Sequence, residues 1–156
     1  MSPNPTTEPA VDPLALDHQV CFALVVAARN VVQLYRPILE PIGLTHPQYL
    51  VMLALWQHAP LSIKDLSGLL QLDPGTLSPL LKRLEAAGLV ERTRSTSDER
   101  LLAVTLTDEG LRLRERALAI PGAVMERLGM GLDELTDLRD ALTRVIAAST
   151  PDDRKA

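Results

Sequence analysis

A single cysteine and a tyrosine are the residues of this chain best suited to redox chemistry. Cys21 is the one cysteine among 156 residues, and Tyr35 follows it by fourteen positions within an apolar helical pattern. A lone thiol excludes an intrachain disulfide and a cysteine-based zinc site. A thiolate can, however, attack a peroxide and become a sulfenic acid. The residue type leaves two interpretations open for Cys21: a chemical sensor, or a small apolar side chain in a core.

The spacing of Cys21 and Tyr35 restricts how the two side chains could meet. Fourteen helical residues advance about 21 Å along the axis and return to within about 40° of the same face. The two side chains therefore cannot touch on one straight helix. If two copies of the helix cross antiparallel, the thiol of one subunit can meet the phenol of the other. A phenol donor favours the thiolate, so we expect the chemistry at a dimer interface.

The helix that carries this pair is predicted from Leu14 to about Leu39, and Pro37 should bend or end it. Before it, residues 1–12 are rich in proline and predict a disordered tail. After it, Thr45 and Gln48 have the spacing of a capping box and predict a helix to about His58. Ser62 begins a further short helix that ends near residue 70.

A third short helix carries leucines on one face and ends at Gly88, which is typical of a helix C-terminus. Because Pro79 is best tolerated in a first turn, Thr76 is predicted as the N-cap in preference to Asp73. Alternating residues then predict a β-hairpin, Leu89–Arg94 and Arg100–Leu106, joined by a polar loop. Two further helices are predicted, one that Thr107 caps and that Pro121-Gly122 interrupts near residue 120, and one over residues 132–148.

This order of elements predicts a mainly α fold with a small β-hairpin wing, a winged helix-turn-helix. We expect one domain over residues 13–150, with the winged helix-turn-helix at about 45–106. The helices at about 13–43 and 107–148 would form an intertwined homodimer.

The predicted DNA-reading residues lie on the third short helix and on the hairpin. The leucine face of the helix is buried, so small hydroxyl side chains near its N-terminus would approach phosphates and base edges, and two basic residues would neutralise phosphates. An arginine on a thin hairpin can enter the minor groove, and an aspartate two residues before it could fix its rotamer. The alternative is that the hairpin arginines are ordinary exposed residues paired with Glu91 and Glu99. The residues predicted to contact DNA are Thr76, Ser78, Lys82, Arg83, Arg94, Asp98 and Arg100.

The stretch from Leu44 to Thr107 resembles the MarR family of winged-helix regulators. The residues that carry the resemblance are LTHPQYLVMLALW, LDPGTLSPLLKRLEAAGLVERTRSTSDERLLAVTLTDEG and, within the second, the D-x-R element Asp98-Glu99-Arg100. The segment QVCFAL, the position of Tyr35 and GTLSPLLKRLE are similar to the OhrR branch, whose members sense organic hydroperoxides. The resemblance covers about residues 17–148.

This resemblance implies a repressor that binds a pseudo-palindromic operator in double-stranded DNA as a homodimer. It also implies release when Cys21 is oxidised, with Tyr35 as hydrogen-bond partner of the reactive sulfur. With no second cysteine, the expected product is either a mixed disulfide with a low-molecular-weight thiol or an over-oxidised sulfur. The chain departs from the branch at Val25 and His46, where the branch often has tyrosines. A pocket for organic peroxides is predicted from Phe22, Leu53, Trp56 and His46, for which plain core packing is the alternative.

Composition adds few constraints. The net charge of −4 means that any attraction to DNA must come from a local patch. Neither a signal peptide nor a membrane span is expected, because uninterrupted apolar runs such as Tyr49–Trp56 are too short, so a cytoplasmic protein is predicted. The scattered histidines His18, His46 and His58 predict no metal site, and no cofactor is expected.

Two competing functions remain open from the sequence. The first is a MarR-type repressor that a small aromatic ligand releases from DNA, with Cys21 only structural. The second is a one-cysteine peroxidase. Since nothing in the chain resembles a peroxidase fold, we predict that the protein is not an enzyme.

Overall fold

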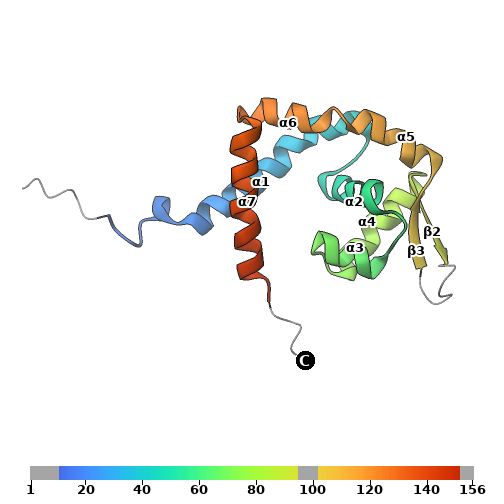
Figure 1. Cartoon of the computed structure of the whole chain (residues 1–156), viewed down its shortest axis with the longest axis horizontal. Coiled ribbons are helices and arrows are strands. Elements are labelled where there is room, and N and C mark those ends of the chain that lie inside the picture. Colours follow the sequence, from blue (N-terminus) through green and yellow to red (C-terminus); the bar gives the residue numbers. More distant parts are fainter. Residues whose placement is uncertain (1–10, 95–101, 152–156) are drawn as a thin grey trace, which may run out of the picture.

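A computed structural model of the chain describes residues 11–94 and 102–151. Helices dominate, and a three-stranded sheet is the β structure of the described part (Figure 1). In chain order the elements are η1 Leu16–His18, α1 Val20–Leu39, η2 Glu40–Ile42, α2 His46–His58, β1 Leu61–Ser62, α3 Ile63–Leu70, α4 Pro74–Ala86, β2 Val90–Arg94, β3 Leu102–Leu106, α5 Asp108–Ala117, α6 Ile120–Leu128 and α7 Leu132–Ser149.

The hydrophobic core lies where α2, α3 and α4 pack against the sheet. The side chains with no exposed surface are Leu39, Val51, Met52, Leu66, Leu77, Leu81 and Val104. Figure 1 shows these three helices and the hairpin gathered at one end of the molecule, with α1 and α7 extending away from them. The core therefore belongs mainly to the helix-turn-helix and its wing, while the long helices are left to pack elsewhere.

The sheet is antiparallel with strand order β1-β3-β2. Val90 pairs with Leu106 and Arg94 with Leu102, which confirms the predicted hairpin within the described residues. The strand β1, paired through Leu61 and Val104, was not predicted. Two residues are too few for an alternating pattern, so β1 is defined only by its pairing with β3.

Capping residues set most helix boundaries. The capping box at α2 is confirmed, because Thr45 Oγ1 accepts the Gln48 N–H and Gln48 Oε1 accepts the Thr45 N–H. Thr107 caps α5 by accepting the Gly110 N–H at 3.0 Å. Gly88, with a φ of 77°, follows α4 in the left-handed conformation that glycine favours.

Three expectations about helix limits were wrong. Asp73, and not Thr76, is the N-cap of α4, since its carboxylate accepts the Thr76 N–H at 2.8 Å and Pro74 occupies the first turn. The first long helix begins at Val20 and not at the predicted Leu14, because Gln19 has an extended backbone, although the helix ends at Leu39 as predicted, two residues after Pro37. Pro121 sits in the first turn of α6, where the missing N–H costs no hydrogen bond, so it begins a helix and does not interrupt one.

The long helices expose much of their apolar surface. No residue of α7 is buried, and α1 buries only Leu39. By length and composition alone, Val20–Ile42 would suffice to cross a membrane, although a helix from the core of a soluble protein meets the same criterion. The polar residues Arg29, Asn30 and Gln33 interrupt the apolar sequence of this stretch. The exposed apolar side chains on the two helices are Val20, Phe22, Val25, Val32, Leu132, Leu138, Val145 and Ile146.

Candidate nucleic-acid interface and thiol site

The recognition-type helix α4 buries one face and exposes the other. Its leucines Leu77, Leu80, Leu81 and Leu84 are buried in the core. Thr76, Lys82 and Arg83 are exposed, and Ser78 is half-buried. The surface that the sequence predicts to contact DNA is thus free in the protomer.

The corrected N-cap changes the surroundings of Thr76. Its hydroxyl donates to Asp73 Oδ2 at 3.1 Å, so its proton is already engaged. Thr76 can still accept a hydrogen bond from a base, but to donate to a phosphate it must leave the Asp73 carboxylate. The negative charge of Asp73 also opposes close approach of a phosphate at this end of α4.

The arginines of the wing differ in their surroundings. Arg92 Nε lies 3.2 Å from Glu85 Oε2, and the Arg92 side chain is only 18% exposed. This ion pair holds β2 against α4, so Arg92 has a structural position, as in the alternative considered for the hairpin arginines, but its partner is Glu85 on α4. Arg94 is exposed at the end of β2. Asp98 and Arg100 lie outside the described residues.

A close backbone contact fixes the base of the wing. Gly110, in the first turn of α5, lies directly against the carbonyl of Leu89, and a Cβ at residue 110 would come 2.1 Å from that oxygen. Thr107 adds two bonds here, from its N–H to the Leu89 carbonyl at 3.1 Å and from its hydroxyl to the Gly88 carbonyl at 2.6 Å. The Trp56 indole N–H donates to the Gly110 carbonyl at 2.9 Å. These contacts tie α2, α5 and the start of β2 together.

Cys21 is the second residue of α1 and its side chain is exposed. Because α1 runs without a break from Val20 to Leu39, Cys21 and Tyr35 lie about 21 Å apart along its axis. The structure therefore does not bring the two together within one protomer. The N-cap Gln19 makes no side-chain bond to the first turn, so within the part of the chain that the structure describes no capping side chain occupies the first backbone N–H groups of α1.

Tyr35 belongs to a cluster of three rings that joins α1 to α2. Its ring centroid lies 4.8 Å from that of His46 and 5.8 Å from that of Tyr49. Burial raises the pKa of Tyr35 and lowers the pKa of His46. Burial, and then the charge of Tyr35, raise the pKa of Tyr49. At neutral pH the cluster therefore consists of protonated phenols and a neutral imidazole.

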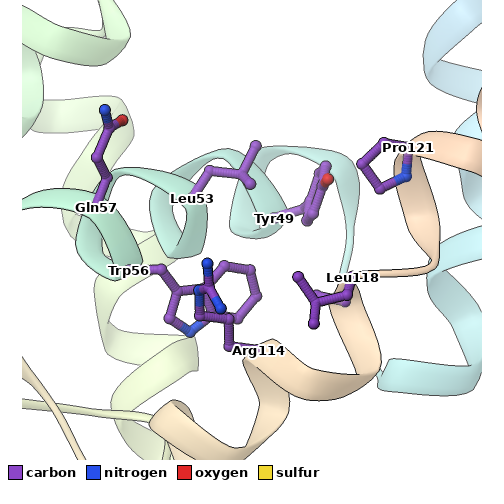
Figure 2. Close-up of a pocket in the computed structure, with 8 residues that line it drawn as sticks. Tyr49, Leu53, Trp56, Gln57, Arg114, Leu118 and Pro121 are labelled. Atoms are coloured by element: carbon purple, nitrogen blue, oxygen red, sulfur yellow. The ribbon is translucent and has the colours of Figure 1, made fainter.

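The predicted peroxide pocket is divided by the structure. Leu53 and Trp56 line one pocket of about 480 Å³ between α2 and the α5–α6 region (Figure 2). His46 lines a separate pocket of about 690 Å³, beside Arg36 and Glu40. Phe22, 45% exposed on α1, lines neither. Within one protomer the four residues therefore do not line one pocket, and their grouping stays a prediction about the dimer.

The pocket at Trp56 also contains a residue that the sequence did not single out. Arg114 reaches its mouth from α5, opposite the α2 side chains (Figure 2). No sequence signal marks Arg114, because its place depends on how α5 packs against α2. Among the described residues, no cluster of histidine, cysteine or acidic side chains could hold a metal ion.

Comparison with known proteins identifies the family. The MarR family profile matches residues 44–102. The organic hydroperoxide resistance transcriptional regulator of Bacillus subtilis is 40% identical over 131 residues, which are 84% of this chain and 89% of that protein. The chain belongs to the MarR family. MarR-family proteins are transcriptional regulators that bind DNA as dimers and are not enzymes.

Solved structures agree with this MarR-family assignment. AbfR of Staphylococcus epidermidis is 35% identical, with a TM-score of 0.72 over 85% of this chain and 92% of that one. Reduced AbfR has also been solved bound to DNA, with a TM-score of 0.70. CouR from Rhodococcus jostii RHA1, solved with p-coumaroyl-CoA, has a TM-score of 0.76 at 27% identity, over 89% of this chain and 99% of that one. The predicted fold class, a winged helix-turn-helix dimer, is confirmed.

Proposed function

We propose that this MarR-family regulator is a repressor that leaves its operator when an organic hydroperoxide oxidises Cys21. One observation carries the proposal: the single thiol of the chain lies exposed in the first turn of α1, a helix with exposed apolar side chains. In the proposal, a second subunit covers this apolar face. The similarity to the hydroperoxide resistance regulator of Bacillus subtilis supports the choice of oxidant.

The first turn of α1 suits a reactive sulfur. A negative charge there is stabilised by the positive end of the helix dipole and by backbone N–H groups that no capping side chain occupies. If two α1 helices cross antiparallel, Tyr35 of the partner subunit supplies a phenol donor. Burial keeps that phenol protonated, so it can donate to an anionic sulfur.

The chemical step transfers one oxygen atom. The thiolate of Cys21 attacks the outer oxygen of the hydroperoxide, an S–O bond forms and the O–O bond breaks. The alkoxide that leaves takes a proton from solvent and becomes an alcohol, while the sulfur is oxidised to a sulfenic acid. A low-molecular-weight thiol can then condense with the sulfenic acid, giving a mixed disulfide and water. The cytoplasm supplies both this thiol and the operator.

Oxidation would act on DNA binding through the dimer. The added oxygen needs space and polar partners in an apolar interface, so Tyr35 shifts and the long helices readjust. The spacing of the two recognition helices then no longer matches successive half-sites of the operator. In this proposal residues 45–106 read DNA, while the helices in 13–43 and 107–148 hold the dimer. The contact set is the predicted one: Thr76, Ser78, Lys82, Arg83, Arg94, Asp98 and Arg100.

A substitution of Cys21 separates oxidation from other modes of release. The wild-type protein and Cys21→Ser should bind operator DNA alike when reduced, because the side chain is exposed and serine is similar in size. One equivalent of an organic hydroperoxide such as cumene hydroperoxide should release the wild type and leave the variant bound. Release is measured by the fluorescence anisotropy of a labelled operator. If the hydroperoxide releases both proteins equally, the proposal is wrong.

A second function is favoured by the pocket at Trp56. Its apolar lining and the cation of Arg114 suit a small aromatic acid, and CouR was solved with an aromatic acyl-CoA. In that case Cys21→Ser would still respond to the ligand, whereas Arg114→Ala would lose the response to a carboxylated aromatic such as salicylate. An undiminished response of Arg114→Ala would remove this pocket from consideration.

A further inference from the structure

The ring cluster around Tyr35 contains an imidazole where the resembling branch often has a phenol. His46 is the first residue of α2, and its ring lies 4.8 Å from that of Tyr35 with a tilt of 56° between the planes. Tyr49, one turn further along α2, packs on Tyr35 at 5.8 Å. Both separations lie in the range of aromatic pairs.

The backbone that carries His46 is held on both sides. Thr45 and Gln48 exchange the two hydrogen bonds of the capping box, and the ring of Pro47 fixes the backbone between them. The imidazole therefore stands on a rigid helix start, whereas Tyr35 comes from α1, the helix that must move if the interface changes. The contact of His46, at the rigid start of α2, can therefore set the position of the Tyr35 side chain on α1.

We propose that His46, together with Tyr49, is a positioning residue that holds the Tyr35 phenol toward the thiol of Cys21 of the partner subunit. This inference rests on the proposed oxidation of Cys21 and deepens it. His46 takes no part in the reaction itself; it acts through Tyr35. Its imidazole supplies the ring contact that a phenol would otherwise supply at this place.

The neutral form of His46 is the one that serves this role. The charged groups that line its pocket are Arg36, from α1, and Glu40, from η2, while the ring of Tyr35 packs against it. The positive end of the α2 dipole opposes a charge on its first residue. Burial also disfavours the charged imidazole. Protonation in acid therefore changes the charge, and with it the electrostatics, of the group that packs against Tyr35.

The composition of the chain allows a direct measurement of this contact. Tyr35 and Tyr49 are the only tyrosines, so NMR of tyrosine-labelled protein gives two ring signals, which Tyr49→Phe assigns. The Tyr35 signal should shift with pH at a midpoint below the ordinary histidine pKa of about 6.5. His46→Phe should abolish this shift, and His58→Gln, at an exposed histidine, should retain it. An unchanged shift in His46→Phe overturns the inference.

Oxidation kinetics test whether the contact matters for the sulfur. Cumene hydroperoxide at pH 7 should oxidise Cys21 roughly two- to tenfold more slowly in the His46→Ala variant than in the wild type. This is the factor in rate expected from the loss of one aromatic pair. His46→Phe, which keeps a ring, should recover to within about twofold. A wild-type rate in His46→Ala, or a phenylalanine variant as slow as the alanine variant, overturns the positioning role.

Failure of this inference is distinguishable from failure of the proposed function. If hydroperoxide releases Cys21→Ser from DNA as it releases wild type, the proposed oxidation itself is wrong. If Cys21→Ser stays bound to DNA but Cys21 of the His46→Ala variant is oxidised at the wild-type rate, only the role of His46 is wrong. Thermal melting of each variant shows whether a slow rate reflects a loss of folding.

Discussion

Replacing Gly110 with alanine should destabilise the protein although alanine is the better helix former. In an exposed helix this change would add up to about 1 kcal/mol of stability. Here the new Cβ would lie 2.1 Å from the Leu89 carbonyl oxygen and 3.1 Å from its carbon. Both atoms are backbone, so α5 or the start of β2 must move by about 1 Å to restore van der Waals separation.

That movement has a calculable cost. It strains the bond from the Thr107 N–H to the Leu89 carbonyl and the bond from Trp56 to the Gly110 carbonyl, each about 1 kcal/mol. Overpacking itself costs about 1–3 kcal/mol. After the gain in helix propensity, the net loss should be about 2–4 kcal/mol, which lowers Tm by roughly 4–16 °C in a chain of this length.

Thermal melting at fixed protomer concentration measures this effect, because the stability of a dimer depends on concentration. Gly68→Ala is the matched control, since a Cβ at Gly68 in α3 meets nothing within 4 Å. It should melt at or slightly above the wild-type temperature. If Gly110→Ala melts no lower than wild type, the close packing of α5 on the base of the wing is refuted.

Three further predictions concern the cap of α4, the DNA surface and pH. Asp73→Ala should lower the free energy of unfolding by about 1 kcal/mol, because it removes the acceptor of the Thr76 N–H. Chemical denaturation measures this loss. A larger loss in Thr76→Ala would contradict the assignment of Asp73 as the N-cap. Lys82→Ala should weaken binding to all operators alike and reduce the slope of log affinity against log salt by about one per phosphate contact, whereas an unchanged slope would remove Lys82 from the phosphate contacts. Burial lowers the pKa of His46 in the folded state, so the unfolded chain takes up the proton first and the free energy of unfolding should fall as pH drops below about 6.5. His46→Phe should show a smaller fall, and an identical pH dependence would exclude His46 as its source.

Local capping chemistry made much of the fold predictable. Thr45, Thr107 and Gly88 each mark a boundary through bonds or conformations that involve only near neighbours in sequence. The failure at Thr76 came from weighing one local rule above another. Asp73 caps α4 with Pro74 in its first turn, and α4 includes Pro79, so the rule that places proline in a first turn was given too much weight at Pro79.

Features that depend on tertiary packing were not predictable. β1 exists only through its pairing with β3, and Arg114 reaches the Trp56 pocket only because α5 packs against α2. His46 was interpreted from sequence as the loss of a phenol, yet its ring packs against Tyr35. The contact between Cys21 of one subunit and Tyr35 of the other was inferred from the rise and rotation of a helix, and it stays a prediction about the dimer.

Intact mass and DNA binding, measured on the same sample, test the oxidation of Cys21 most directly. One equivalent of cumene hydroperoxide should add the mass of one oxygen per subunit to the wild type, or a thiol adduct if a small thiol is present, in proportion to the operator released. Cys21→Ser should gain no mass and stay bound. Release without a mass change, or an oxidised Cys21 that still binds its operator, would contradict the account.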